Sequence, residues 1–408
     1  MTRWAGTRDS ATLAIGSLIS GLAAYGFIAF GNRAIGSTDF AAVSVLWTLW
    51  AMSAAVLTFP IQHWVIRTVE VDGGEGRIRR AIPRLLLAAS AISVLFGLIC
   101  WLFRLRLFTT GATVFPILAA LVPIGSVLMG LNRGVLASRN RFRSTAVAIA
   151  GENLIRLAVS IPMTSASGLG IALIAGFGVG AFWPSSFRLQ MTGSTSAQGS
   201  PVAFVGSVGG GTLIGQVVMT SGPLVLAAIG GTPAEVTALF SALALFRAPY
   251  MVAIGVTPRL TADLTRVMLD QGDSARKRLV VRTSMVAVAL LLLAASLGWA
   301  IGPGLLKFVF GPDVVITSWA AAVVAGASAI ALCVLFLTVI MVAAARLVEV
   351  SLAWAGAALA GGLFLVIDQG LPIDRVAEAF LVAEVGVFIL MVLALSSRRS
   401  LWPAQSRI

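Results

Sequence analysis

Histidine and cysteine are nearly absent from this sequence. It has one histidine, His63, and two cysteines, Cys100 and Cys333, which lie far apart within apolar runs. Zinc sites are built from clusters of cysteine, histidine and acidic ligands, and a disulfide framework needs several cysteines at regular spacings. The sequence therefore predicts neither a metal site nor a disulfide framework, and it leaves little material for a catalytic triad that contains histidine.

Charge is also scarce. Charged residues make up 11% of the 408 residues, hydrophobic residues make up 58%, and the mean hydropathy is +0.98. Soluble domains carry about 25% charged residues. We therefore expect one polytopic membrane protein. Arg3 and Arg8 precede an apolar stretch without a convincing cleavage site, which favours an uncleaved first transmembrane helix over a signal peptide.

Apolar segments long enough to cross a bilayer recur along the whole chain, since a crossing takes about 20 residues of helix. Twelve such segments can be counted: 11–30, 40–61, 81–103, 111–131, 144–165, 168–187, 203–229, 237–258, 283–302, 317–343, 350–367 and 376–396. The sequence thus predicts an all-α polytopic membrane protein with about 12 transmembrane helices.

The basic residues support this map. With the N-terminus in the cytoplasm, 22 Lys and Arg residues fall in the inner loops and tails, including Arg133 after the fourth span, and two lie inside spans. The outer loops hold only five: Arg33, Arg104, Arg106, Lys307 and Arg375. This split follows the positive-inside rule and predicts cytoplasmic N- and C-termini. The net charge of +13 is therefore mainly a topology signal, with some attraction to anionic membrane lipids, and it does not indicate a nucleic-acid partner.

The two halves of the chain resemble each other weakly. Residues 17–49 and 211–246 share a Leu-Ile pair and an Ala-Ile-Gly turn. An even number of spans in each half gives both halves the same orientation, as in transporters built from parallel repeats. We predict an N-lobe of residues 1–190, with helices 1–6, and a C-lobe of residues 201–408, with helices 7–12. Chance alignment of helices rich in Ala, Gly and Leu is the alternative.

Two further features interrupt the apolar pattern. Gly222-Pro223 and Pro249 predict breaks in the seventh and eighth spans, because proline frees backbone carbonyls within a helix. The long basic segment 259–282 carries a stripe of aliphatic residues at helical spacing. It is expected to form an amphipathic helix on the inner membrane surface.

Several of these motifs resemble a known superfamily. The twelve-span arrangement, the first hairpin closing on "AIGSTDFAAVSVLWTL" (Ala34 to Leu49) and the outer turn "LLKFVFGPDV" (Leu305 to Val314) are similar to multidrug/oligosaccharidyl-lipid/polysaccharide (MOP) exporters. Within that superfamily the chain most resembles the polysaccharide flippases of high-GC bacteria. It departs from them at "PIQHWVIR" (Pro60 to Arg67), where relatives tend to carry acidic residues.

The resemblance implies a fold and a function. The fold is two six-helix lobes around a central cavity that opens alternately to each side. The function is translocation of an undecaprenyl-linked oligosaccharide across the bacterial cytoplasmic membrane, for polysaccharide biosynthesis. The implied partners are this lipid-linked glycan, membrane lipids and, as a further expectation, a polysaccharide polymerase or glycosyltransferases.

The fifth span carries polar residues near its middle. Glu152, Asn153 and Arg156 stand in the stretch "AIAGENLIRLAV", and Glu152 and Arg156 are four residues apart, so they share a helix face. A bare charge at the centre of a transmembrane helix costs about 2.5–3.5 kcal/mol on insertion scales. These residues are therefore expected to face a wet cavity or the interior of the bundle.

The second half has a similar pair, Arg247 in the eighth span and Glu384 in the twelfth. If the two pairs share one cavity, they form a belt of zero net charge. We predict a substrate site that uses the phosphate-binding chemistry of arginine. Its residues are Arg156, Arg247, Asn153, Gln216 and Arg33.

The two glutamates, Glu152 and Glu384, are expected to be counter-charges or sites of coupling to H+ or Na+. No bound cofactor and no catalytic residue is predicted. The alternative for each half is that the arginine pairs with the nearest glutamate and holds helices together, and that Arg33 extends its charge to the outer membrane surface.

Other function classes remain open. A multidrug or organic-cation antiporter of the same superfamily is the main alternative, but such exporters commonly rely on an acid in the first span, and residues 11–30 contain none. A membrane enzyme is disfavoured, because glycosyltransferases and acyltransferases need clustered acids or histidine at a membrane face. A non-transporting scaffold is the third alternative.

Overall fold

The computed structural model describes residues 2–72, 74–109, 113–182, 214–344 and 346–397. Within these ranges the chain is helical and contains no strand, as the sequence predicts. The chain divides into two compact units: unit 1 is Met1–Ala238 with Lys307–Val314, and unit 2 is Leu239–Leu306 with Val315–Ile408. The predicted junction between the lobes, at residues 191–200, lies outside the described residues, so the lobe assignment stays a prediction.

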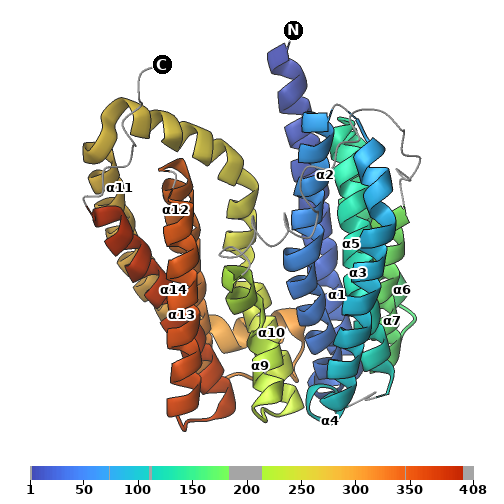
Figure 1. Cartoon of the computed structure of the whole chain (residues 1–408). Coiled ribbons are helices and arrows are strands. Elements are labelled where there is room, and N and C mark those ends of the chain that lie inside the picture. The colour runs from blue at the N-terminus through green and yellow to red at the C-terminus, as the bar shows by residue number, and fades with distance from the viewer. Residues whose placement is uncertain (1, 73, 110–112, 183–213, 345, 398–408) are drawn as a thin grey trace. The chain divides into compact units, whose positions relative to one another are not determined.

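Unit 1 is a bundle of long helices that run up and down beside one another (Figure 1). Its elements are α1 (Thr2–Ser53), η1 (Ala54–Thr58), α2 (Phe59–Asp72), α3 (Gly76–Leu102), α4 (Arg104–Leu107), α5 (Val114–Ser138), α6 (Phe142–Ser160), α7 (Ala166–Phe182) and α9 (Gly222–Ala228). Helix α1 packs mainly against α6, α5 packs against α2, α3 and α7, and α6 packs against α7.

Helix α1 is in fact two helices joined at a sharp bend. Gly36 has φ 78° and ψ 163°, a backbone conformation that is essentially restricted to glycine. The predicted first and second spans therefore meet at Gly36 and not in an extended loop. The second half continues through the π-helical turn η1 into α2, so the helix extends to Asp72, beyond the predicted end of the span at residue 61.

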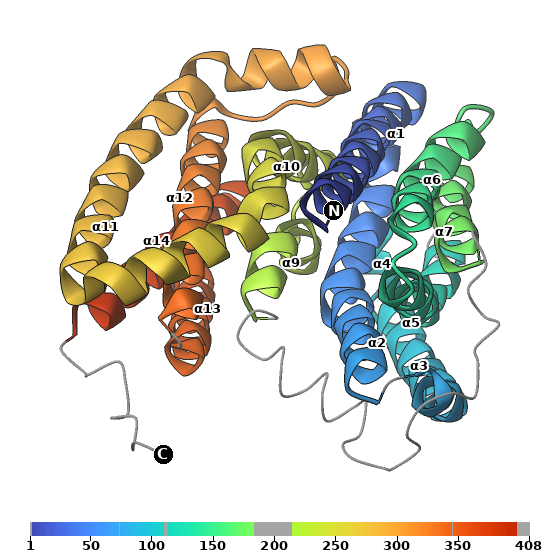
Figure 2. The ribbon, with the colours of Figure 1, turned by 90° about the horizontal axis from the view of Figure 1, so that it is seen from above.

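Unit 2 contains most of α10 (Pro233–Phe246), whose first residues belong to unit 1, and most of α11 (Ala248–Phe310). It also contains α12 (Ser318–Ala343), α13 (Leu347–Ile367) and α14 (Pro372–Ser396). Helices α12 and α13 both pack against α14. Helix α11 forms an arch that rises, crosses and descends again (Figures 1 and 2).

Helix α11 takes in three predicted pieces: the end of the eighth span, the basic connection 259–282 and the ninth span. The connection is helical, as predicted, but its side chains over 254–276 lie outside the described residues, so its place on the membrane surface stays a prediction. The two expected breaks are present, because helix is interrupted at Ser221 and again at Arg247.

The described helices include enough long, apolar ones for the chain to cross a membrane several times. Seven of them are long and apolar enough to cross a bilayer, and α7 and α10 are shorter apolar helices. Helix α6 is not among the seven; it carries three charged residues, Arg143, Glu152 and Arg156. Because lipid tails are as apolar as the side chains, helices in a membrane are held together by close packing and polar contacts.

The close packing of α5 positions the site described below. A Cβ atom on Gly130 would lie 2.7 Å from the carbonyl oxygen of Thr58, and one on Gly134 would lie 2.7 Å from the Cβ of Val65. The Thr58 hydroxyl donates a hydrogen bond to the carbonyl oxygen of Ser126, at 3.0 Å. These small residues let η1 and α2 approach the face of α5 that borders Arg133.

Candidate functional site

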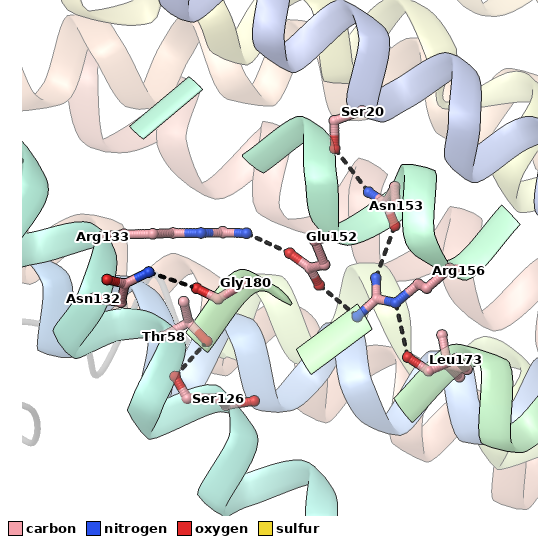
Figure 3. Close-up of polar contacts among 10 residues, drawn as sticks. All are labelled: Ser20, Thr58, Ser126, Asn132, Arg133, Glu152, Asn153, Arg156, Leu173 and Gly180. Atoms are coloured by element: carbon pink, nitrogen blue, oxygen red, sulfur yellow. Dashed lines mark hydrogen bonds and ion pairs between the residues drawn. The ribbon is translucent and has the colours of Figure 1, made fainter. Parts of the chain in front are cut away.

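The polar residues of α6 form one connected network in the interior of unit 1 (Figure 3). Glu152 is its centre. The Oε1 atom of Glu152 forms an ion pair with Nη2 of Arg156 at 2.5 Å, and Oε2 accepts a hydrogen bond from Nη2 of Arg133 on α5. Glu152 is 2% exposed, so two guanidinium groups share a single buried carboxylate.

Arg156 is completely buried; its Nη2 forms the ion pair with Glu152, and its other two nitrogens donate hydrogen bonds. Its Nε donates to the carbonyl oxygen of Leu173 on α7 at 2.9 Å, and its Nη1 donates to Oδ1 of Asn153 at 2.8 Å. The guanidinium carbon lies 4.2 Å from the ring centroid of Trp50, within the range of a cation–π interaction. In this conformation Arg156 has no atom open to a ligand.

Asn153 extends the network to α1, because its Nδ2 donates to Oγ of Ser20 at 2.8 Å. The neighbouring turn of α7 leaves room for the arginine through a glycine. A Cβ atom on Gly176 would lie 2.6 Å from Nε of Arg156 and 2.8 Å from the carbonyl oxygen of Glu152. The network therefore ties together α1, α5, α6 and α7.

Arg133 is the member that the sequence analysis missed. It was counted in the loop after the fourth span, whereas the structure places it inside α5, five residues before the helix ends at Ser138. It is 8% exposed, so its charge is held within the bundle and not in the loop. The available signal was the apolar run "MGLNRGVLAS", which continues past residue 131 without a helix breaker.

The charges of the network do not balance. Arg133 and Arg156 carry two positive charges, and Glu152 is the one acidic side chain in contact with them among the described residues. The two guanidinium groups also repel each other. This network thus holds an excess of one positive charge, where the sequence analysis expected one arginine matched by one glutamate.

Unit 2 brings together the other predicted pair. Arg247 lies at the break between α10 and α11, 7% exposed, with its guanidinium carbon 4.5 Å from the ring centroid of Phe380 on α14. Glu384, one helical turn after Phe380, is fully buried and attracts Arg247 electrostatically. Neither carboxylate oxygen of Glu384 has a hydrogen-bond partner among the described residues.

The last two predicted site residues lie apart from the network. Gln216 is half-buried in the helical turn before α9, where its backbone carbonyl accepts a hydrogen bond from the Thr220 hydroxyl at 2.7 Å. Arg33 is exposed, and its guanidinium donates to the carbonyl oxygens of Phe308 and Val309. It therefore caps the C-terminal end of α11, which is favourable for a cation.

In unit 1, Arg156 forms an ion pair with Glu152, whereas in unit 2 Arg247 and Glu384 interact electrostatically and no hydrogen bond between them is found among the described residues. Substrate contact by these residues stays a prediction, and so does one cavity shared by all four charges. Among the described residues, no group of three or more His, Cys, Asp or Glu side chains is placed to hold a metal ion.

A second ion pair lies at the end of unit 1 that holds the α5–α6 turn. Arg139 donates from Nε to Oε1 of Glu75 at 2.5 Å and from Nη2 to Oε2 at 2.7 Å. The hydrogen-bonded carboxylate raises the pKa of Arg139 above its ordinary value. This pair fixes the beginning of α3 to the end of α5.

Comparison with known proteins identifies the fold. No model of a known protein family matches the chain, and no curated protein does. Several solved structures, however, are similar to this chain. An inward-facing multidrug resistance MATE family transporter of the MOP superfamily is 13% identical, with a TM-score of 0.66 over 94% of this chain and 98% of the other.

Two further solved structures are similar. The lipid II flippase MurJ, in an inward closed conformation, is 14% identical, with a TM-score of 0.59 over 94% of this chain and 87% of its own. The MATE multidrug transporter DinF-BH, in complex with R6G, is 17% identical, with a TM-score of 0.58 over 96% of this chain and 95% of its own. These neighbours are transporters and a flippase. The chain is an all-α, multi-pass membrane protein with the fold of MOP-superfamily exporters.

Proposed function

We propose that the chain is a flippase that carries an undecaprenyl-linked oligosaccharide across the bacterial cytoplasmic membrane by alternating access, for polysaccharide biosynthesis. Both termini lie in the cytoplasm in this proposal, as the distribution of basic residues predicts. The substrate carries negative phosphate groups next to its lipid. Glycosyltransferases or a polysaccharide polymerase would act on the glycan before or after the flippase moves it.

The observation that carries the proposal is the positive charge held inside unit 1. Two buried guanidinium groups share one carboxylate, so the interior favours an anion over a cation. The desolvation cost of an unbalanced buried charge amounts to several kcal/mol per ion, which an anionic ligand would offset. An organic cation would instead be repelled by Arg133 and Arg156.

The residues predicted from the sequence take distinct roles in this proposal. Arg247 contacts the phosphate groups of the substrate, because it is not matched by a hydrogen-bonded acid. Arg156 and Asn153 set the shape and charge of the interior of unit 1, with Glu152 as their counter-charge. Gln216 and Arg33 are secondary contacts, and Glu384 is the site of coupling to H+ or Na+.

A flipping assay tests this function. The purified protein is placed in liposomes with a fluorescent undecaprenyl-diphosphate oligosaccharide, and a membrane-impermeant quencher reports how much of the lipid reaches the outer leaflet. Arg247→Ala should abolish flipping. Arg143→Ala, which removes an exposed charge from the beginning of α6, is the matched control and should flip like the wild type. Absence of flipping by the wild type with several glycan lipids would contradict the proposal.

One observation favours a second function, export of organic cations. Glu384 is fully buried with both carboxylate oxygens unpartnered, which suits a cation, and two of the similar solved structures are multidrug transporters. Uptake of a fluorescent organic cation into the same liposomes under an imposed H+ or Na+ gradient separates the alternatives. Transport of the cation without flipping of the glycan lipid would favour the antiporter.

A further inference from the structure

Arg133 differs from Arg156 in the donors that it has left. A guanidinium has five N–H donors. Within unit 1, Arg156 donates hydrogen bonds from Nε and Nη1, and its Nη2 forms the ion pair with Glu152. Arg133 uses one, the Nη2 that contacts Glu152, and its buried Nε has no acceptor among the described residues. Arg133 is also the one of the two that retains exposed surface.

Arg133 is therefore the member of the network that keeps donors unused, and it is 8% exposed where Arg156 is fully buried. Glu152 contacts Arg156 through one carboxylate oxygen and Arg133 through the other. Glu152 therefore fixes the position of the Arg133 guanidinium and leaves the other donors of Arg133 unused. A planar guanidinium that presents two adjacent donors binds phosphate oxygens in a bidentate manner. Phosphate groups carry one or two negative charges, and one of these charges would offset the excess positive charge of the network.

The position of Arg133 along α5 fits the entry of such a group. It lies five residues before the end of α5, or about 7.5 Å at 1.5 Å per residue. That end leads into the turn with Arg139, Arg141 and Arg143, of which the last two are exposed. The positive-inside rule predicts that this turn is cytoplasmic, so Arg133 is expected near the inner surface of the membrane, on the side of the inner-leaflet headgroups.

We propose that Arg133 binds a phosphate or diphosphate group of the ligand at the cytoplasmic end of unit 1, and that Glu152 and Arg156 are positioning residues that hold its guanidinium. The inference rests on the proposed function, since it names the contact that loads an anionic lipid. It assigns this contact to a residue on α5, whereas Arg247 and Glu384 belong to unit 2.

A binding measurement on the purified, full-length protein in detergent tests this. Four probes are titrated and followed by tryptophan fluorescence: undecaprenyl diphosphate, undecaprenyl monophosphate, the uncharged undecaprenol and inorganic pyrophosphate. Trp47 and Trp50 lie within 6 Å of the Arg156 guanidinium and serve as reporters, with ring centroids at 5.7 and 4.2 Å. Undecaprenol shows how much affinity the lipid chain supplies, and pyrophosphate shows whether a free anion suffices.

Arg133→Gln should weaken binding of undecaprenyl diphosphate by at least about tenfold, the effect of a lost charge-assisted hydrogen bond, and leave undecaprenol unchanged. Arg133→Lys keeps the charge but loses the planar fork. Its affinity for undecaprenyl diphosphate should lie between those of Arg133→Gln and the wild type. It also replaces the glutamine variant in the test if that variant does not fold. Arg143→Gln removes an equal, exposed charge from the beginning of α6 and should bind like the wild type.

The outcomes separate the inference from the proposed function. Equal diphosphate affinity in wild type, Arg133→Gln and Arg133→Lys, with flipping retained, would overturn the role of Arg133 and leave the flippase standing. No binding or flipping of any diphosphate lipid by the wild type would overturn both. Pyrophosphate that binds as tightly as the lipid, with the same dependence on Arg133, would support the phosphate site and assign it to a free anion.

Discussion

Gly176 on α7 lies directly against the guanidinium of Arg156 on α6. A Cβ atom at residue 176 would be 2.6 Å from Nε and 2.7 Å from Cγ of Arg156, both far inside van der Waals contact. The arginine cannot retreat, because its three nitrogens are held by Leu173, Asn153 and Glu152. The absence of a side chain at Gly176 is therefore what allows a charged residue to be fully buried at this level of the bundle.

Gly176→Ala should destabilise the protein by about 1–3 kcal/mol, as overpacking does in tightly packed interiors. Thermal unfolding in detergent measures this. Gly178→Ala on the same helix is the matched control, because a Cβ atom there would have no neighbour within 4 Å. Similar midpoints for the two variants would contradict the placement of Arg156 against α7.

Gly36 provides a test of the bend in α1. Its φ of 78° and ψ of 163° are accessible to glycine and strained for other residues, so Gly36→Ala should cost about 1–3 kcal/mol of stability. The cost arises from the backbone, because the added Cβ atom would meet Oδ2 of Asp313 at an ordinary 3.5 Å.

Gly21→Ala is the control in the regular part of α1. No atom lies within 4 Å of a Cβ at that position, and alanine is favoured over glycine in a helix by up to about 1 kcal/mol. Gly21→Ala should therefore be neutral or stabilising. A neutral Gly36→Ala would mean that α1 runs straight through this residue.

The shared carboxylate predicts an unequal response to charge removal. Glu152→Gln leaves two buried guanidinium groups without a counter-charge and should cost about 3–5 kcal/mol. Arg133→Gln leaves Glu152 and Arg156 as a one-to-one pair, so it should cost clearly less. A double-mutant cycle on residues 133 and 152, followed by thermal unfolding, measures their coupling. Zero coupling would show that Arg133 does not contact Glu152.

For Arg247 and Glu384 in unit 2, we expect removal of one charge to destabilise the protein more than removal of the other. A carboxylate that loses its partner can take up a proton, whereas a guanidinium stays charged at every accessible pH. Glu384→Gln should therefore destabilise the protein more than Arg247→Gln, as measured by unfolding midpoints at neutral pH. The reverse order would indicate that Arg247 is solvated and does not depend on Glu384.

The ion pair of Arg139 with Glu75 should contribute to the stability of the protein by an amount that does not change with pH near neutrality. Its pKa is raised by the hydrogen-bonded Glu75 carboxylate, so the stability that it adds is present below its ordinary pKa and is lost only as the pH rises through the raised value. The difference in midpoint between wild type and Arg139→Gln should thus stay constant between about pH 7 and pH 10. A difference that shrinks within this range would contradict the bidentate pair.

The sequence by itself determined the membrane class, the helical fold and the pairing of Glu152 with Arg156. Hydropathy and the positions of arginine report directly on which residues lie in lipid, and residues four apart in a helix must share a face. The breaks at Ser221 and Arg247 were also predictable, because glycine and proline act locally.

The tertiary structure decided what the charges do. The role of Arg133 depends on how far α5 extends and on the neighbouring helix that carries Glu152, and neither is encoded in the local pattern. The burial of Arg156 depends likewise on Gly176 of α7 and on Trp50 of α1. Hydropathy places a residue along the membrane normal, but the contacts between helices determine which charges are neutralised and which remain available to a ligand.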